Sequence, residues 1–442
     1  MTPHSARRGL ILVVDDEDAV RRSMSEILED EGYAVVPASS GEEGIEQALA
    51  RSPDVIFLDV WLPGVDGIEA LRMMRERGVR APVIMISGHG TIETAVKATK
   101  RGAYDFVEKP LSLERVLLVL RNALRHARLE RQHRALQVEL RREAEFIGRG
   151  AAVEALRARL AAAADGRPVL LHGERGSGRS LAARWLSLHG PRPDGPFLDL
   201  RAGAAPPERL VRALYGGEGA GPDDAGRIAL ADEGTLYIEG AEALPPEVQR
   251  SLAEGLRTGS FPVPGAARGV RSELGLIVSL SGPPPSKEVE GPLDPGFLEA
   301  FPHRIDLPPL RARAEDLPEL AAVFLQEISR EYGQPVPTLA LDALHALARH
   351  AWPGNVRELR RVVERVVLAS PPPVVHAEDL PPGFLDGRET GPPAPPPARE
   401  LEAGWLRRLL DEVGGDVGRA APRLGLSEPD LRAHLAALGL LA

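Results

Sequence analysis

Cysteine is absent from this sequence of 442 residues, which excludes disulfides, thiolate metal sites and a cysteine nucleophile. Lysine is scarce, because the 54 basic residues include only Lys97, Lys100, Lys109 and Lys287. No apolar run approaches the roughly 20 residues that a membrane span needs, and the apolar stretch near the N-terminus is too short for a signal peptide. We therefore expect a cytoplasmic protein without a membrane segment. The net charge of -10 argues against a wholly basic nucleic-acid coat but allows a small DNA-reading module.

The length and the hydrophobic pattern predict several domains, because one hydrophobic core does not normally serve a chain this long. Short apolar runs alternate with amphipathic segments over the first quarter of the chain, which indicates a doubly wound, parallel α/β sheet. We expect an α/β multidomain protein with these parts: a first α/β domain, 1–125; a linker helix, 126–143; a second α/β core, 144–310; a helical lid, 311–385; a proline-rich linker, 386–399; and an all-α unit, 400–442.

A leucine stripe crosses the border between the first domain and the linker helix. Its first four members alternate spacings of four and three, which is typical of a dimeric coiled coil. The alternative is a domain helix that continues as an intramolecular connector. The sequence leaves both readings open and favours the dimer. The stripe consists of Leu113, Leu117, Leu120, Leu124, Leu129, Leu136 and Leu140.

Polar side chains follow the predicted strands of the first domain at their carboxyl ends. Asp15 and Asp16 end the first strand, and Asp59 ends the third. Ser87 ends the fourth strand, and Lys109 lies just beyond the fifth. These loop ends gather at one edge of an open parallel sheet. Converging carboxylates favour a divalent cation such as Mg²⁺, while the lysine and the hydroxyl can hold a phosphoryl group.

The motifs VVDDE, IFLDVWLPGVDGIE, VIMISGHG and GAYDFVEKP resemble the receiver domain of two-component response regulators. The resemblance implies a CheY-like, doubly wound receiver that accepts a phosphoryl group from a sensor histidine kinase. It assigns these roles: phospho-acceptor, Asp59; Mg²⁺ ligands, Asp15, Asp16 and Asp59; switch pair, Ser87 and Phe106; phosphoryl contact, Lys109.

The segment GERGSGRS, residues 173–180, departs at one position from the G-x-x-x-x-G-K-[ST] loop that binds nucleotide phosphates. Gly173, Gly176 and Gly178 allow an anion nest of backbone amides, and Ser180 keeps the hydroxyl. Arg179 replaces the lysine, and its planar fork is not equivalent to a compact ammonium. The loop therefore predicts a phosphate-binding shape and leaves the binding of ATP or ADP undecided.

The middle of the chain resembles the AAA+ domain of NtrC-type, sigma-54-dependent activators, through FIGRG, VLLHGERGSGRS, EGTLYIEG, RIDLPPLRARAEDLPEL and WPGNVRELR. The resemblance implies a P-loop α/β core with a helical lid, and adds Arg357 of the lid to the nucleotide site. Where the family pattern has Asp-Glu, this chain has Glu239 and Gly240, so the water-activating carboxylate is missing; Ser281 replaces an asparagine. Positioned acid–base groups contribute about 10²–10⁴-fold. We therefore expect that the chain has no catalytic residue, that its ATP hydrolysis is absent or near background, and that it is not an enzyme.

Family members that act on sigma-54 RNA polymerase carry a G-A-F-T-G-A loop. This chain has GAGPDDA at positions 219–225, which is short, acidic and free of threonine and aromatic residues. The departure makes a sigma-54 contact with RNA polymerase doubtful.

The tail AAPRLGLSEPDLRAHLAALGL resembles the Fis-type helix-turn-helix that ends NtrC-type proteins. Ser427 is the expected N-cap of the recognition helix. Acidic residues in the first turn of that helix predict weak binding to phosphates. A dimerisation module without DNA contact is the alternative. The candidate DNA-binding residues are Arg419, Arg423, Ser427, Arg432 and His434.

We interpret the chain as an NtrC-type response regulator that is phosphorylated on Asp59 and controls transcription through DNA binding. The AAA+ domain is expected to act as a non-hydrolysing platform in a dimer or higher oligomer. Two alternatives stay open: an ATP-driven sigma-54 activator, and a phosphorylation-gated scaffold without DNA binding.

Overall fold

A computed structural model describes residues 8–88, 98–204, 206–217, 225–281, 293–369, 373–381, 398–424 and 426–441. The chain divides into two compact units, residues 1–140 and 141–442, and each is described by itself. Within the described ranges, no helix is long and apolar enough to cross a membrane.

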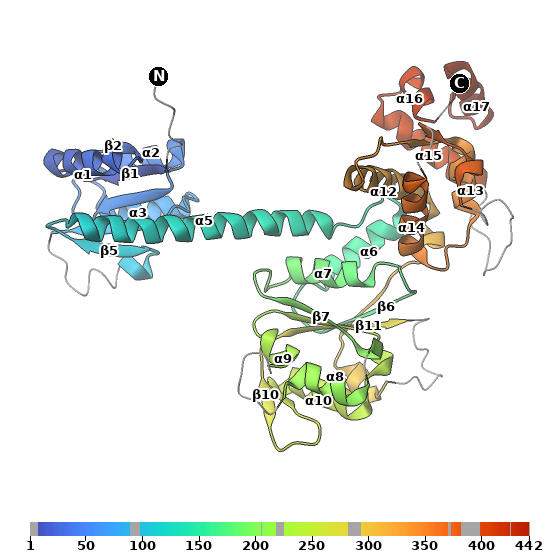
Figure 1. The fold of residues 1–442 in the computed structure, drawn as a ribbon, viewed down its shortest axis with the longest axis horizontal. Helices are drawn as coiled ribbons and strands as arrows, with labels where there is room; N and C mark the ends of the chain where they lie inside the picture. Colours follow the sequence, from blue (N-terminus) through green and yellow to red (C-terminus); the bar gives the residue numbers. More distant parts are fainter. Residues whose placement is uncertain are drawn as a thin grey trace. The chain divides into compact units, whose positions relative to one another are not determined.

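The first unit is built on a five-stranded parallel sheet in the order β2-β1-β3-β4-β5 (Figure 1). This order confirms the doubly wound fold, with the change of direction between β1 and β3. The elements are β1 (Leu10–Val14), α1 (Asp18–Asp30), β2 (Ala34–Ala38), α2 (Gly41–Arg51), β3 (Val55–Asp59), α3 (Gly67–Glu76), β4 (Val83–Ser87), β5 (Asp105–Glu108) and α5 (Leu113–Glu143).

Helices cover both faces of this sheet, because alternate strand residues point to opposite sides. Leu12 and Leu58 pack with α2 and α3 on one face. Ile11 and Phe57 pack with α1 and α5 on the other. Burial on both faces explains why the strands read as continuous apolar runs.

Helix α5 divides the leucine stripe into two parts. Leu120 is fully buried, and Leu117 and Leu124 pack against the same receiver core. Leu129 and Leu136, by contrast, are 56% and 57% exposed. Leu117, Leu120 and Leu124 therefore serve the fold of the receiver, whereas Leu113, Leu129 and Leu136 lie on the surface of a long helix (Figure 1).

The second unit begins with a P-loop α/β core whose five parallel strands follow the order β12-β6-β11-β8-β7. Its elements are α6 (Ala151–Ala162), β6 (Val169–Gly173), α7 (Arg179–His189), β7 (Phe197–Arg201), η1 (Ala202–Ala204), α8 (Pro207–Tyr215), α9 (Arg227–Leu230), β8 (Thr235–Glu239), η3 (Ala241–Ala243), α10 (Pro246–Thr258), β9 (Ser260–Pro262), β10 (Gly269–Arg271), β11 (Gly275–Ser281), α11 (Pro295–Glu299) and β12 (His303–Asp306).

Helices dominate the rest of the second unit, and one apolar cluster spans the lid and the C-terminal helices. Trp352 lies fully buried in it and donates its indole N–H to the Leu347 carbonyl at 2.9 Å. Most of the predicted proline-rich linker lies outside the described residues. The elements are η4 (Leu310–Asp316), α12 (Leu317–Glu331), β13 (Thr338–Leu339), α13 (Leu341–Arg349), α14 (Asn355–Leu368), β14 (Val374–Val375), η5 (Ala377–Asp379), α15 (Ala398–Glu412), α16 (Val417–Arg423) and α17 (Glu428–Ala437).

Candidate phospho-acceptor and nucleotide sites

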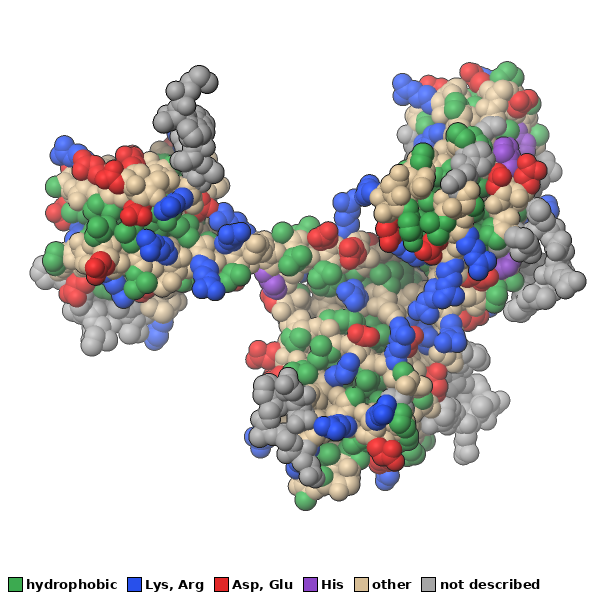
Figure 2. All heavy atoms as spheres, viewed as in Figure 1, with side chains coloured by type: hydrophobic (Ala, Val, Ile, Leu, Met, Phe, Trp, Pro, Cys, Tyr) green, Lys and Arg blue, Asp and Glu red, His purple; other side chains and the backbone are tan. Residues whose placement is uncertain are grey.

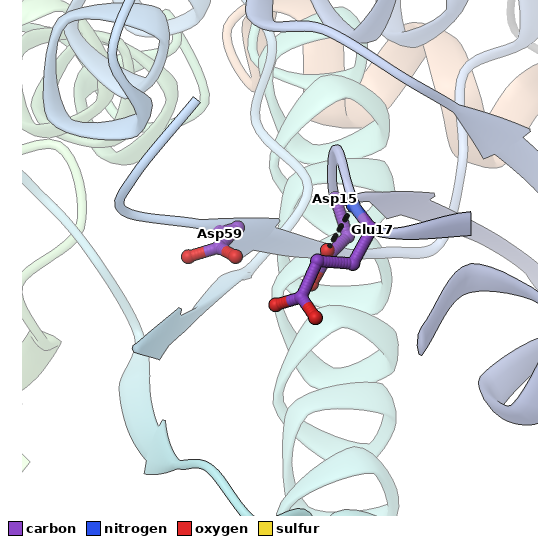
Figure 3. Close-up of side chains that lie close together, drawn as sticks. All are labelled: Asp15, Glu17 and Asp59. Carbon is purple, nitrogen blue, oxygen red and sulfur yellow. Dashed lines mark hydrogen bonds between the residues drawn. The ribbon is translucent and has the colours of Figure 1, made fainter. Parts of the chain in front are cut away.

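Three carboxylates converge at the carboxyl end of the receiver sheet. Asp15 follows β1, Asp59 ends β3, and Glu17 lies in the turn before α1; their oxygens lie within 4.8 Å of one another (Figure 3). Asp15 and Asp59 are buried. Such a set of hard oxygen ligands fits Mg²⁺.

Lys109 binds all three carboxylates. Its Nζ lies 2.6 Å from an Asp59 oxygen, 2.8 Å from Asp15 and 3.0 Å from Glu17. Burial by itself lowers the pKa of Lys109, but the hydrogen bonds to the three carboxylates outweigh it and raise the pKa above its usual value. Burial raises the pKa of Asp15, against the lowering effect of Lys109. The lysine can therefore balance negative charge that arrives at Asp59.

The three carboxylates that converge in the structure differ at one position from the predicted Mg²⁺ ligands. Asp16 is exposed and is not among the three converging carboxylates, whereas Glu17 is. The Glu17 amide donates to the Asp15 carboxylate at 2.9 Å, and this turn places the Glu17 side chain beside Asp15 (Figure 3). Sequence reasoning missed Glu17, although it directly follows the paired aspartates.

The remaining receiver residues lie around Asp59. Ser87 is the buried last residue of β4, and Phe106 is half-buried on β5. Gly67 starts α3 against Asp59: a Cβ at this glycine would lie 1.8 Å from the Asp59 carbonyl oxygen. Glycine is therefore required for the helix to start this close to the acceptor.

The phosphate loop of the second unit connects β6 to α7. Gly173 ends β6, and Gly176 and Gly178 have φ of 79° and 106°, a region that favours glycine. Arg179 and Ser180 open α7, the arginine buried and the serine exposed. Backbone amides at the start of a helix in such a loop suit an anion.

Arg179 links two of the other positions that depart from the family pattern. It donates from Nη1 to Ser281 Oγ at 2.8 Å, and its Nη2 lies 3.5 Å from Glu239 Oε1. The other Glu239 oxygen lies 3.0 Å from Arg201 Nε. These substitutions therefore belong to one interacting network and are not separate losses.

The lid packs directly on the phosphate loop. Arg311 forms two hydrogen bonds with Glu174, one of 2.9 Å, and these hold the pKa of Glu174 below its ordinary value. Asn355 of α14 donates to Glu174 at 3.0 Å. Arg357 is exposed on α14, and its Cβ lies 3.1 Å from the Cβ position of Gly176. Sequence reasoning chose Arg357 but missed the other two lid residues, Arg311 and Asn355.

Most of the predicted DNA-binding residues are exposed on the C-terminal helices. Ser427 caps α17 and accepts from the Asp430 amide, as predicted. Arg432 binds Glu428 at 2.8 Å, so an acidic neighbour compensates its charge. Figure 2 shows both signs of charge on the visible face of these helices. Arg419 and Arg423 are exposed on α16, and His434 is half-buried on α17.

The fold and these sites define a receiver domain joined to an AAA+ P-loop domain with a helical lid. Residues 11–121 match the response regulator receiver domain, 146–290 the sigma-54 interaction domain, and 311–396 the AAA+ ATPase lid domain. These matches confirm both fold assignments.

The chain belongs to the NtrC/NtrX family of two-component response regulators. It is 35% identical to the nitrogen assimilation regulatory protein NtrX of Azorhizobium caulinodans, over 97% of this chain and 99% of the relative. It is 31% identical to the transcriptional regulator NtrC of Escherichia coli, over 91% and 88%. The crystal structure of Brucella abortus NtrX in complex with ATP is similar, with a TM-score of 0.66, 31% identity, and coverage of 98% and 99%.

The expectation that this chain is not an enzyme is wrong. The sigma-54 interaction domain that it matches is an ATPase domain in the NtrC family, and Brucella abortus NtrX was crystallised with ATP and with ADP. That expectation treated Arg179, Glu239 and Gly240 as independent losses of catalytic groups. Two of these residues instead interact within one site.

Proposed function

We propose that the chain is a response regulator phosphorylated on Asp59 by a sensor histidine kinase, working in the cytoplasm. The observation that carries this proposal is the 2.6 Å contact between Lys109 and the Asp59 carboxylate, beside two further acids. A carboxylate oxygen of Asp59 attacks phosphorus, and the phosphorus–nitrogen bond of the kinase phosphohistidine breaks. The imidazole nitrogen keeps the electron pair, and Lys109 balances the transferred charge.

The test is phosphorylation of the full chain with acetyl phosphate, with and without Mg²⁺, followed by intact-mass measurement. We expect one added phosphate in the wild type and in Asp18→Asn, whose aspartate is exposed on α1. Asp59→Asn should remain unmodified, and removal of Mg²⁺ by EDTA should abolish the reaction. Stoichiometric phosphate on Asp59→Asn would refute the assignment. In a separate comparison, the extent of phosphorylation of Asp16→Asn and of Glu17→Gln at limiting Mg²⁺ should show which of the two acids helps to bind the ion.

We further propose that the phosphate loop binds ATP or ADP. The support is the positive-φ glycines before α7, the lid residues seated on the loop, and the nucleotide complexes of Brucella abortus NtrX. Equilibrium dialysis with labelled ATP tests the proposal. A change of Gly176 to valine should abolish binding, because even its Cβ would lie 2.2 Å from the Gly354 carbonyl oxygen. Binding that survives this change would place the nucleotide elsewhere.

The output is proposed to be transcriptional control through the C-terminal helices of a dimer. Ser427 caps the predicted recognition helix, and Glu428 pairs with Arg432 of that helix, so each subunit should bind DNA weakly and with a shallow salt dependence. Leu129 and Leu136 on α5 are the proposed dimer surface. DNA titration of the phosphorylated full chain at two salt concentrations is the test. Absence of binding would favour the scaffold alternative.

A sigma-54-dependent output is the second candidate, and the match of residues 146–290 to the sigma-54 interaction domain favours it. Against it stands the short acidic sequence at 219–225, most of which lies outside the described residues; Gly216 and Ala225 pair across its base. Retention of sigma-54 polymerase by the ATP-bound chain would support this candidate. Promoter binding without such retention would support control by occupancy alone.

A further inference from the structure

Glu242 lies beside the position where the family pattern has its water-activating carboxylate. Gly240 follows β8 with φ of 76° and has no side chain to offer. The short helix η3 then turns the chain, held by a hydrogen bond from the Ala243 amide to the Gly240 carbonyl at 3.0 Å. This turn brings Glu242 Oε1 to 3.9 Å from the Cβ position of Gly240. That separation is comparable with the reach of a glutamate side chain from its own Cβ.

The Glu242 carboxylate also faces the end of β11. Its Oε1 accepts from the Ser281 amide at 3.3 Å. The Ser281 hydroxyl in turn accepts from Arg179 of the phosphate loop at 2.8 Å. Ser281 thus connects the Glu242 carboxylate by two hydrogen bonds to Arg179, which directly follows Gly178 of the phosphate loop.

The second oxygen of Glu242 is buried and has no hydrogen-bond partner among the residues that the structure describes. A buried carboxylate oxygen without a partner is costly, so it marks a place for a water molecule or a ligand. Glu239, the acid that ends β8, is already engaged by Arg179 and Arg201. Burial lowers the pKa of the neighbouring His172 and so disfavours a positive charge beside Glu242.

We propose that Glu242 activates the attacking water in ATP hydrolysis, in place of the side chain that Gly240 lacks. The inference rests on the proposed binding of ATP. The Glu242 carboxylate takes a proton as the water oxygen bonds to the γ-phosphorus. The bond from that phosphorus to the bridging oxygen breaks, ADP keeps the electron pair, and the proton then passes to solvent as inorganic phosphate leaves.

The test compares Glu242→Gln with the wild type as full chains treated with acetyl phosphate and Mg²⁺. Equilibrium dialysis measures ATP binding, and single-turnover phosphate release measures hydrolysis. Glu247→Gln, an exposed acid on the following helix α10, is the matched control. We expect Glu242→Gln to bind ATP within a few-fold of the wild type and to hydrolyse it about 100-fold or more slowly. Glu247→Gln should behave as the wild type does.

The pH dependence of the hydrolysis rate distinguishes a general base from a carboxylate that only stabilises the fold. Because a general base acts in its deprotonated form, the wild-type hydrolysis rate should rise with pH, whereas the residual rate of Glu242→Gln, which lacks the proposed base, should not follow this rise. His172 is a titratable neighbour that interacts electrostatically with Glu242, and it is unchanged in this variant. A parallel rise in both proteins would overturn the proposal.

The failures of the two proposals are distinguishable. Wild type that binds ATP without hydrolysing it, or Glu242→Gln that hydrolyses at the wild-type rate, would refute the role of Glu242 and leave nucleotide binding intact. Wild type that binds no ATP would refute nucleotide binding, and the catalytic role would fall with it.

Discussion

Removal of the Arg179 side chain should destabilise the second unit through the Glu239 carboxylate. Arg179 is buried, with 5% of its side chain exposed, and Glu239 is 21% exposed. Removing one partner of a buried ion pair typically costs about 3–5 kcal/mol. Here Glu239 keeps Arg201 and some solvent, so we expect about 2–3 kcal/mol for Arg179→Ala. For a domain of this size, that corresponds to a fall in Tm of roughly 5–10 °C.

The assay is urea and thermal unfolding followed by tryptophan fluorescence, with Trp185 on the same helix α7 as a reporter. Arg201→Ala is the matched control, because that arginine is 68% exposed and its ion pair should contribute about 0–1 kcal/mol. Arg179→Lys should fall between the two, since a lysine cannot bind Ser281 and Glu239 with a planar fork. Equal stability losses for Arg179→Ala and Arg201→Ala would refute the role of the buried network.

Three further changes test other parts of the chain. Gly67→Ala should slow phosphorylation by acetyl phosphate, because its Cβ would lie 1.8 Å from the Asp59 carbonyl oxygen. Gly78→Ala, which adds backbone strain at a φ of 85° but meets no atom within 4 Å, is the control, and equal rates would contradict the argument. Ser427→Ala should lose the cap of α17 and destabilise it by about 1 kcal/mol, visible as faster hydrogen exchange in that helix; unchanged exchange would count against the cap. Leu136→Glu should convert a dimer to a monomer in sedimentation experiments, and an unchanged mass would exclude this surface.

The receiver site could be predicted almost completely from the sequence, because its residues end parallel strands and parallel strand ends meet. Asp15, Asp59 and Lys109 come together as expected. The choice between Asp16 and Glu17 could not be predicted, since it depends on how the turn after β1 hydrogen-bonds. The amide of Glu17 binds the Asp15 carboxylate, and Asp16 is left exposed.

The nucleotide site was harder to predict because motif comparison examines each position alone. Arg179, Glu239 and Ser281 lie far apart in the sequence but next to one another in space. The carboxylate of Glu242 approaches the site only because η3 turns the chain after Gly240. Such a displacement by two residues has no signature in a strand motif, so the proposed role of Glu242 could not be predicted from the sequence.

In this lysine-poor chain, the contacts made at positions 109 and 179 suit the different shapes of lysine and arginine. Lys109 reaches three separate carboxylates from one nitrogen, at 2.6–3.0 Å, which suits a compact charge with three donors. Arg179 instead uses two nitrogens for two different partners, the Ser281 hydroxyl and the Glu239 carboxylate, which suits a planar fork. An arginine at 109 would need room for its fork among buried acids, whereas a lysine at 179 would approach Ser281 and Glu239 with one nitrogen in place of two. The chemistry of each position therefore accounts for the residue type that the chain has there.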